Sequence, residues 1–269
     1  VGPKDRGFAM GLNEFAGYFA VGIMAFVTGH IANKYGIHPY PFYIGIGIAL
    51  LGWIISAIWV KDTHHFVVHE SETDHTMALK SVFKETTFTN KTLSSVTQAG
   101  LVNNLNDGMI WGLFPLFLLG LGFSLEVVAV LTAIYPSVWG MGQLVTGKMS
   151  DNINPKKILF WGMFIQSIAI LLLVSTQQLV FLGLLSALLG LGTALVYPTF
   201  LHVVATNTQP LQRAESLGTF RLWRDLGYVF GALSSGIIAD SFGLNTAIFS
   251  IGLLTLLSSG VIAVRMPNP

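Results

Sequence analysis

Five ionisable side chains lie inside long apolar stretches of this sequence. They are Glu14, Asp107, Arg221, Arg224 and Asp225. A charge at the centre of an apolar helix in a membrane costs about 2.5–3.5 kcal/mol on insertion scales, so such residues usually face a cavity or a partner. Buried carboxyl groups can carry protons, and buried guanidinium groups can bind anions. These residue types therefore predict a polar site enclosed by helices.

Asp107 lies in the stretch NNLNDG, with Asn103 one helical turn before it and Asn104 three residues before it. A carboxyl group among side-chain amides suits substrate hydrogen bonding or proton coupling. The alternative is a polar break that lets the helix bend near Gly108 and Pro115. We favour the functional interpretation of Asp107 and its two asparagines.

Arg221, Arg224, Asp225 and Tyr228 follow i, i+3, i+4, i+7 spacing and should share one helix face. Arg221 and Asp225 can pair within the helix, which would leave Arg224 as a net positive group. This face could bind an anionic substrate group, or exchange partners with a buried carboxylate during a conformational change. A permanent charge network that fixes helix packing explains the pattern equally well.

Three further features are candidates for the same site. Glu14 lies one to two turns inside its stretch, so packing near the membrane edge explains it as well as a role in the site. Tyr135, Trp139 and Gln143 form an i, i+4, i+8 stripe that could line an amphipathic site, although ordinary packing is the commoner reason for such a stripe. Tyr197 precedes a proline that we expect to interrupt its helix.

The segment 61–96 differs sharply in composition from the rest of the chain. It contains a cluster of possible metal ligands: His64, His65, His69, Glu70, Glu72, Asp74 and His75. His65 and His69 have i, i+4 spacing, which a metal could use. A solvated linker explains the same composition, and we expect no metal site. Within the segment, residues 76–84 (TMALKSVFK) are expected to form a short amphipathic helix on the membrane surface.

Long apolar stretches dominate the chain. Its 269 residues are 52% hydrophobic and 10% charged, against about 25% charged in soluble domains. A helix needs about 20 apolar residues to cross a bilayer. We therefore expect an all-α polytopic membrane protein with eight transmembrane helices, at 8–32, 41–60, 97–121, 125–149, 156–175, 179–204, 214–239 and 244–265.

The basic residues fall almost entirely on one side of this arrangement. If every stretch crosses the membrane, one side holds Lys4, Arg6, Lys61, Lys80, Lys84, Lys91, Lys148, Lys156, Lys157, Arg213 and Arg265. The other side holds Lys34 alone. By the positive-inside rule, the 61–96 loop and the C-terminus are cytoplasmic and the protein lies in the cell membrane. The net charge of +1 gives no general attraction to nucleic acid.

Three of these stretches end alike, at residues 29–36, 147–154 and 236–243. Each ending reads Gly, three residues, Asp or Asn, two residues, then Gly or Asn. The first glycine allows close helix packing and the last residue suits a helix C-cap. Because the three stretches lie three spans apart, the pattern indicates a repeated three-helix unit.

The residues of the second ending resemble a family motif. GKMSDNINPKK, at 147–157, is similar to the loop motif Gly-x-x-x-Asp-Arg-x-Gly-Arg-Arg/Lys of the major facilitator superfamily. Gly147, Asp151, Lys156 and Lys157 fit this motif, whereas asparagines at 152 and 154 replace a basic residue and a glycine. Residues 213–231 (RAESLGTFRLWRDLGYVFG) also resemble the eleventh helix of bacterial members.

This resemblance implies a domain organisation. The family has twelve helices in two halves joined by a long cytoplasmic loop. Residues 1–60 would be family helices five and six, 61–96 the interdomain loop, and 97–269 the complete second half, so we expect a fragment of a longer protein. In the family, helices five, seven, eight, ten and eleven border the cavity. The resemblance also implies that Asp151 contacts the start of the 214–239 helix and stabilises the outward-open state, with a helix end cap as the alternative.

The same resemblance implies a function. We expect a secondary active transporter that moves a small solute by alternating access and uses protons, because buried carboxylates are present and a Gly-x-x-x-x-Gly-Lys-Ser/Thr loop is absent. We expect a monomer in the lipid bilayer, with no cofactor. Efflux of hydrophobic compounds and uptake of small organic anions both stay open. The 8–32 helix lacks the Gly-Pro-rich motif of drug antiporters, which argues against drug efflux.

Two other classes of protein remain as alternatives. A sensor or scaffold that transports nothing would have the same composition and the same helices. An intramembrane enzyme is less favoured, because the sequence lacks His-Glu-x-x-His, Gly-x-Ser-x-Gly and Gly-x-Gly-Asp within a span. We therefore expect that the protein is not an enzyme.

Overall fold

A computed structural model describes residues 6–36, 38–61, 67–69, 72 and 77–268 of the chain. Within this described part the regular structure is entirely helical, which confirms the all-α fold. Two short elements precede the third long helix, namely α4 (Val82–Lys84) and the π-helical turn η2 (Glu85–Thr89). The long helices are α1 (Arg6–Tyr35), α2 (Tyr40–Trp59), α5 (Lys91–Gly120), α6 (Leu125–Asn152), α7 (Pro155–Leu173), α8 (Leu179–Thr206), α9 (Pro210–Phe242) and α10 (Leu244–Arg265).

The chain divides into two units, residues 16–74 and residues 1–15 with 75–269. The first unit contains most of α1 and all of α2. The rings of Tyr35 and Tyr40 lie 5.7 Å apart where these two helices meet. All of the α2 side chains are at least partly exposed, including the apolar Trp53 and Ile58.

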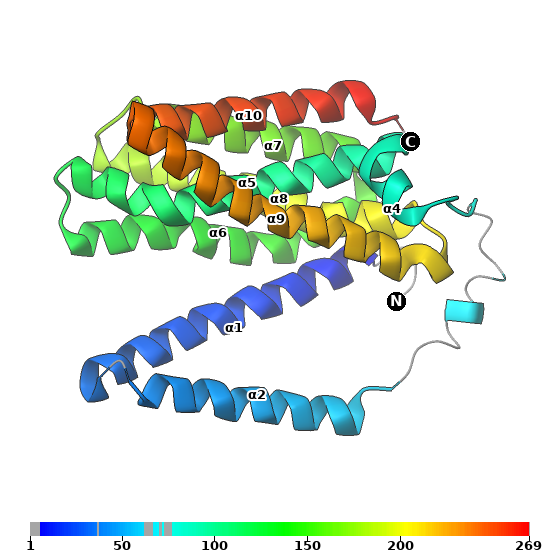
Figure 1. Cartoon of the computed structure of the whole chain (residues 1–269), viewed down its shortest axis with the longest axis horizontal. Coiled ribbons are helices and arrows are strands. Elements are labelled where there is room, and N and C mark those ends of the chain that lie inside the picture. Colours follow the sequence, from blue (N-terminus) through cyan, green and yellow to red (C-terminus); the bar gives the residue numbers. More distant parts are fainter. Residues whose placement is uncertain (1–5, 37, 62–66, 70–71, 73–76, 269) are drawn as a thin grey trace. The chain divides into compact units, whose positions relative to one another are not determined.

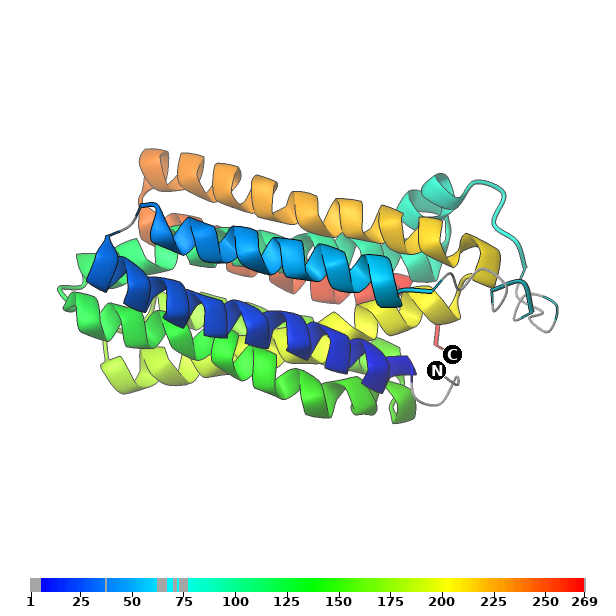
Figure 2. The ribbon, with the colours of Figure 1, turned by 90° about the horizontal axis from the view of Figure 1, so that it is seen from below.

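The second unit contains a bundle of six helices, α5 to α10, together with the first turns of α1 (Figure 1). Helix α5 packs against α9 and α10, α6 packs against α8, and α7 packs against α8 and α10. Figure 2 shows the same bundle after a quarter turn. We call the end at which α5, α7 and α9 begin, and at which α6, α8 and α10 end, the linker end, because segment 77–90 lies there.

Helices α5 and α9 approach each other closely because glycines line the contact. A Cβ atom at Gly227 would overlap the carbonyl oxygen of Leu101, and one at Gly231 would overlap that of Leu105. Small residues let membrane helices approach until their backbones touch. The α5–α9 contact is therefore determined by backbone atoms, which sets how closely the two helices can approach.

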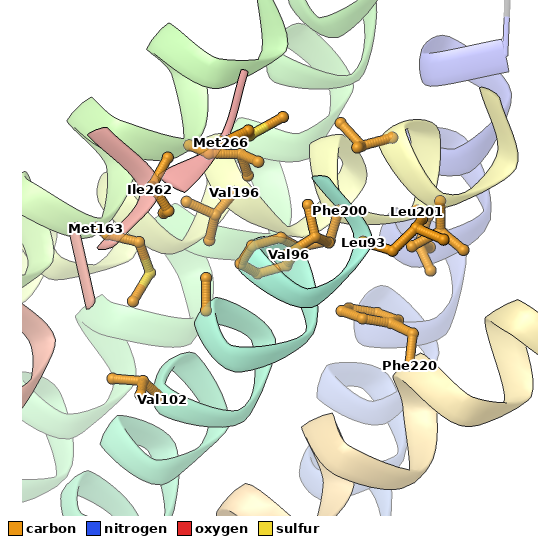
Figure 3. Packing of buried hydrophobic residues seen from close by; sticks show 14 residues of the cluster. Leu93, Val96, Val102, Met163, Val196, Phe200, Leu201, Phe220, Ile262 and Met266 are labelled. Carbon is orange, nitrogen blue, oxygen red and sulfur yellow. The ribbon is translucent and has the colours of Figure 1, made fainter. Parts of the chain in front are cut away.

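The hydrophobic core of the bundle lies toward the linker end. Figure 3 shows its cluster, which includes Leu93 and Val96 from the first turns of α5, and Phe200, Phe220 and Ile262 from α8, α9 and α10. All of these side chains are fully buried. Further along α5, the buried residues change to Asn103, Asn104, Asn106 and Asp107. An apolar layer therefore adjoins a polar layer inside the same bundle.

Several helix boundaries differ from those expected. Helix α5 begins at Lys91, six residues earlier than predicted, because the Asn90 side chain accepts hydrogen bonds from the backbone N–H groups of Thr92 and Leu93, both at 3.0 Å. Such a cap satisfies donors that a helix start otherwise leaves free. Helix α9 also begins early, at Pro210, where a proline loses no helical hydrogen bond.

The predicted interruption of α8 before Pro198 is wrong, since the helix continues through the proline to Thr206. Pro198 has no N–H to donate to the carbonyl of Ala194, one turn earlier. The hydroxyl of Thr146, on α6, donates to that carbonyl oxygen instead, at 2.5 Å. A side chain of a neighbouring helix thus satisfies the group that the proline leaves free, as is common in membrane helices.

Four of the eight long helices, α2, α7, α8 and α10, are long and apolar enough to cross a membrane by length and composition alone. The other four, α1, α5, α6 and α9, fall short of that criterion in the described residues. Helices α1, α5 and α9 carry the candidate ionisable residues, and α6 carries the Tyr135–Gln143 stripe and Asp151. Polar groups inside these helices lower their mean hydropathy, so the expected eight spans reduce to four on this measure.

The predicted amphipathic helix at 76–84 is mostly wrong. Residue 76 lies outside the described residues, and 77–81 form no helix. Only Val82–Lys84 are α-helical, and the chain continues as η2. The side chains of Val82 and Thr86 are nevertheless buried against the bundle, so this part of the linker is packed against protein.

Candidate functional site

Asp107 lies at the centre of a contact between three helices. Its side chain, on α5, is fully buried. One carboxylate oxygen accepts a hydrogen bond from the hydroxyl of Tyr135 on α6, and that hydroxyl also lies 3.3 Å from the hydroxyl of Thr193 on α8. The other oxygen, Oδ2, has no hydrogen-bond partner among the described residues. The Tyr228 hydroxyl, on α9, also interacts with this carboxyl group, so the site contains a buried acid between two tyrosines.

Buried amides extend the polar layer toward the linker end. Asn103 donates to the side-chain oxygen of Asn104 at 3.2 Å, and the Tyr197 hydroxyl lies 3.5 Å from the same oxygen. Asn103 Oδ1, Asn104 Nδ2 and both amide atoms of Gln143 are buried without a partner within the described part of the chain. A buried polar group without a partner costs about 1–3 kcal/mol. Several such atoms together are unusual in a core and indicate groups that can bind something polar.

Aromatic rings surround these amides. Tyr135 and Trp139 stack at 5.8 Å between ring centroids, and Trp139 meets the ring of Tyr197 at 5.0 Å. All three side chains are buried, as is Gln143. The predicted stripe on α6 thus faces the inside of the bundle over its whole length. Thr193 was not among the predicted residues, because a single threonine in an apolar helix has no distinguishing pattern.

The charged face of α9 is arranged differently from the prediction. Arg224 pairs with Asp225, at 2.7 Å between Nε and Oδ1, so the predicted pairing of Asp225 with Arg221 is wrong. The Arg224 guanidinium also lies over the ring of Tyr197, at 5.4 Å. The side chain of Arg224 is 13% exposed and that of Asp225 56%. Neighbouring residues on a helix point in different directions, so Asp225 reaches Arg224 from outside the bundle.

The remaining members of this face differ in burial. Arg221 is exposed and Tyr228 is half-buried. Glu14, in the first turns of α1, is also half-buried, and the positive charges of Arg224 and Arg221 act on its carboxylate. Contacts thus connect six of the predicted residues in one series, from Asp107 through Tyr135, Trp139, Tyr197 and Arg224 to Asp225.

Asp151 contacts α1 and α8. The carboxylate accepts a hydrogen bond from the backbone N–H of Phe8, in the first turns of α1, at 3.0 Å. Its second oxygen lies 3.4 Å from Nδ1 of His202 on α8. The expected contact of Asp151 with the start of α9 stays a prediction. His202, which we expected at the membrane interface, is buried beside Asp151.

The other residues of the loop motif have structural roles around Asp151. Gly147 lies one helical turn before it on α6, and a Cβ at Gly11 of α1 would lie 3.0 Å from the Gly147 Cα. The backbone N–H of Lys156 donates to the Asn154 side chain at 2.9 Å, which caps the start of α7. Lys157, which follows, is exposed. The motif therefore brings α6 close to α1 and ends in a capped turn.

Comparison with known proteins identifies the family. A family model described as Major Facilitator Superfamily matches residues 96–269, which is more than half of the chain. The chain belongs to the major facilitator superfamily. The predicted resemblance is thereby confirmed, and with it the assignment as a multi-pass membrane protein.

Relatives within the superfamily align along nearly the whole chain. The "Multidrug resistance protein MdtG" of Serratia proteamaculans is 24% identical over 264 residues, which cover 96% of this chain and 62% of that protein. The "Uncharacterized MFS-type transporter MJ1560" of Methanocaldococcus jannaschii is 26% identical over 259 residues, 93% of this chain and 66% of that protein. The chain thus spans less than two thirds of the length of these relatives.

A solved structure has a similar fold. The crystal structure of the human organic anion transporter MFSD10 (TETRAN) matches with a TM-score of 0.54 and 22% identity, over 63% of this chain and 41% of that one. At this identity the likeness concerns the fold alone. It agrees with a superfamily fold for the described helices.

The predicted ligand cluster of the linker lies largely outside the described residues, which include only His69 and Glu72 of its seven members. These two side chains lie 3.8 Å apart and are both strongly exposed. Among the described residues, no group of three or more His, Cys, Asp or Glu side chains could hold a metal ion. The described part of the cluster is a solvated surface pair.

Proposed function

We propose that this chain forms part of a secondary active transporter that moves a small solute across the membrane by alternating access. The observation that carries the proposal is the buried carboxyl group of Asp107, which interacts with the hydroxyls of Tyr135 and Tyr228. Buried ionisable residues within membrane helices mark substrate or ion pathways. Superfamily members bind their substrates near the bilayer midplane, between their two halves.

Protons are the proposed coupling ion. A carboxyl group can take up a proton where a bare charge is unfavourable, and the proton can leave when the site opens to water. Tyr135, Asn103 and Asn104 offer hydrogen-bonding groups to a solute bound beside Asp107. Trp139, Tyr197 and Arg224 extend that surface with aromatic rings and one positive charge. The site can thus hold a solute that has both apolar and polar parts.

Asp151 is the proposed gating residue, at the end of the bundle that we place in the cytoplasm. Its contacts with the Phe8 N–H and with His202 connect α6 to α1 and to α8. A carboxylate beside a helix N-terminus is stabilising by about 0.3–1 kcal/mol. The contact with α1 must separate when this end opens, so it favours the outward-open state, whereas His202 holds the carboxylate in place from within the bundle.

The class of solute is tested with one cation and one anion. Relatives are named for multidrug resistance, and the site presents both a carboxyl group and a guanidinium. The full-length protein is reconstituted into liposomes that contain a pH-sensitive dye, and ethidium or benzoate is added across an imposed pH gradient. We expect the solute to cross the membrane while the pH gradient is present, and to stop crossing when the gradient is abolished. If neither compound nor a wider panel moves protons, the protein is a sensor or scaffold.

Asp107→Asn is the variant that tests the coupling residue. It should lower coupled flux by about a hundredfold, within the range for loss of a group that transfers protons. The matched control is Asp240→Asn, on the exposed side of α9. Unchanged flux in Asp107→Asn would remove this residue from the mechanism.

A further inference from the structure

The linker segment 77–90 is attached to the bundle by hydrogen bonds at specific points. The side-chain amide of Gln212, in the first turn of α9, accepts from the Leu79 N–H at 2.8 Å and donates to the Leu79 carbonyl at 3.0 Å. One side chain thereby satisfies both backbone groups of a residue that is in no helix. This pair of bonds depends on the orientation of the amide, because it requires one donor and one acceptor.

A second attachment lies further along the same helix. The indole N–H of Trp223 donates to the Thr87 hydroxyl in η2, at 3.1 Å. Trp223 follows Gln212 by eleven residues, which is about three helical turns, so the two side chains lie on the same face of α9. The segment thus holds one face of α9 over roughly 16 Å.

The segment is also attached to the helices beside α9. The Thr97 hydroxyl of α5 donates to the Thr86 carbonyl at 3.0 Å. Arg265, the last residue of α10, donates to the Phe88 carbonyl at 2.6 Å and to the Ser94 hydroxyl of α5 at 3.1 Å. Segment 77–90 therefore connects α9 to both α5 and α10 at the linker end.

The helices to which the segment is bonded also carry the candidate site. Trp223 directly precedes Arg224, which lies over Tyr197, and α5 carries Asp107. A helix held at two points on one face cannot rotate, or slide by a turn, without breaking both contacts. The glycine contacts between α5 and α9 prevent closer approach but leave sliding possible, because they present smooth backbone surfaces.

We propose that segment 77–90 positions α9 relative to α5, with Gln212 and Trp223 as the positioning residues, and that it thereby sets the distance between Arg224 and Asp107. The expected effect on transport rests on the proposed function, whereas the position of α9 does not. Its structural part concerns the position of α9 and can be measured in the absence of any solute.

The test measures a distance in the purified full-length protein. The chain contains no cysteine, so spin labels can be placed at Leu211→Cys on α9 and Leu257→Cys on α10, both exposed, once any cysteines elsewhere are replaced. A second pair of labels, Leu116→Cys on α5 and Leu233→Cys on α9, both exposed, measures the position of α9 relative to α5 directly. We expect a narrow distance distribution for the parent with each pair. Trp223→Phe and Gln212→Ala should broaden it, or displace its mean by up to about 5.4 Å, one helical turn.

The controls separate positioning from general damage. Trp161→Phe makes the same change at an exposed tryptophan of α7 and should leave the distribution unchanged. Gln212→Glu keeps the acceptor for the Leu79 N–H but loses the donor, so it should give an intermediate effect. If the α9 variants fail to fold, Thr87→Val removes the acceptor from the segment instead. A distribution identical to the parent in Trp223→Phe, Gln212→Ala and Thr87→Val would overturn the proposal.

Transport gives a separate readout. In Trp223→Phe, displacement of Arg224 should raise the apparent KM for benzoate about three- to tenfold, the range expected for loss of one hydrogen bond. If distances respond but benzoate and ethidium show no flux in any variant, the proposed function fails and the positioning role stands. If flux is present and KM stays unchanged while the distances shift, the link from segment to site is overturned.

Discussion

The carboxylate of Asp151 accepts a hydrogen bond from the backbone N–H of Phe8, a residue 143 positions away in the sequence. The first N–H groups of a helix have no partner within the helix, and the helix dipole makes this end slightly positive. Asp151 therefore acts as a cap for α1 that is supplied by α6. His202 lies against the same carboxylate, so three helices meet at one acid.

We predict that Asp151→Ala destabilises this junction more than Asp151→Asn does. The asparagine keeps an acceptor for the Phe8 N–H and loses only the charge, whereas alanine loses both. The expected loss for alanine is about 1 kcal/mol in the free energy of unfolding. Thermal unfolding of the purified full-length protein measures it, with Asp240→Asn as the control. Equal stability of Asp151→Ala and the parent would contradict the capping role.

We predict that Tyr135→Phe impairs proton-coupled flux without unfolding the protein. The substitution keeps the stacked ring beside Trp139 and removes the hydroxyl that donates to Asp107. Loss of a hydrogen bond to a charged group corresponds to about 1.5–3 kcal/mol, or roughly a tenfold to hundredfold change. The measurement is the initial rate of internal pH change in liposomes with benzoate or ethidium.

The control for this prediction is Tyr43→Phe, at an exposed tyrosine of α2. It should leave the rate unchanged, because the Tyr43 side chain is exposed and donates to no candidate residue among the described residues of its own unit. If Tyr135→Phe has the same rate as the parent, the hydrogen bond from Tyr135 to Asp107 is not required for proton-coupled flux.

We predict that Thr146→Val lowers stability by about 1–3 kcal/mol, because the Ala194 carbonyl then has no donor on either helix. Thr146→Ser keeps the hydroxyl and should retain most of the stability. Thr199→Val is the matched control, since the Thr199 hydroxyl bonds to the Leu195 carbonyl of its own helix. Equal melting temperatures for Thr146→Val and Thr199→Val would argue against the compensation of Pro198.

Two glycines of α9 should respond in opposite directions to the same substitution. Gly227→Ala places a methyl group against the Leu101 carbonyl and should destabilise the protein by about 1–3 kcal/mol through overpacking. Gly218→Ala meets nothing within 4 Å and should stabilise the helix by up to about 1 kcal/mol. Thermal unfolding of both variants measures the difference. Similar effects at the two positions would mean that α5 and α9 are not in backbone contact.

The local sequence pattern determined the number of helices and the approximate position of each one. The length and apolarity of the stretches predicted eight long helices, and the structure has eight in its described part, with ends that differ by a few residues. The ends differ because capping depends on single side chains such as Asn90, which no periodicity reveals. The loop motif was enough to indicate the family, since its residues lie close together in the sequence.

The partners of those residues depended on tertiary structure. Asp107 and Tyr135 were both predicted as candidates, but their hydrogen bond requires α5 and α6 to meet at one level of the bundle. Spacing along α9 suggested Arg221 as the partner of Asp225, whereas the structure pairs it with Arg224, which packing against Tyr197 holds in place. Periodicity specifies which face a side chain occupies, but contacts between helices decide which atoms meet, and those contacts join residues up to 177 positions apart.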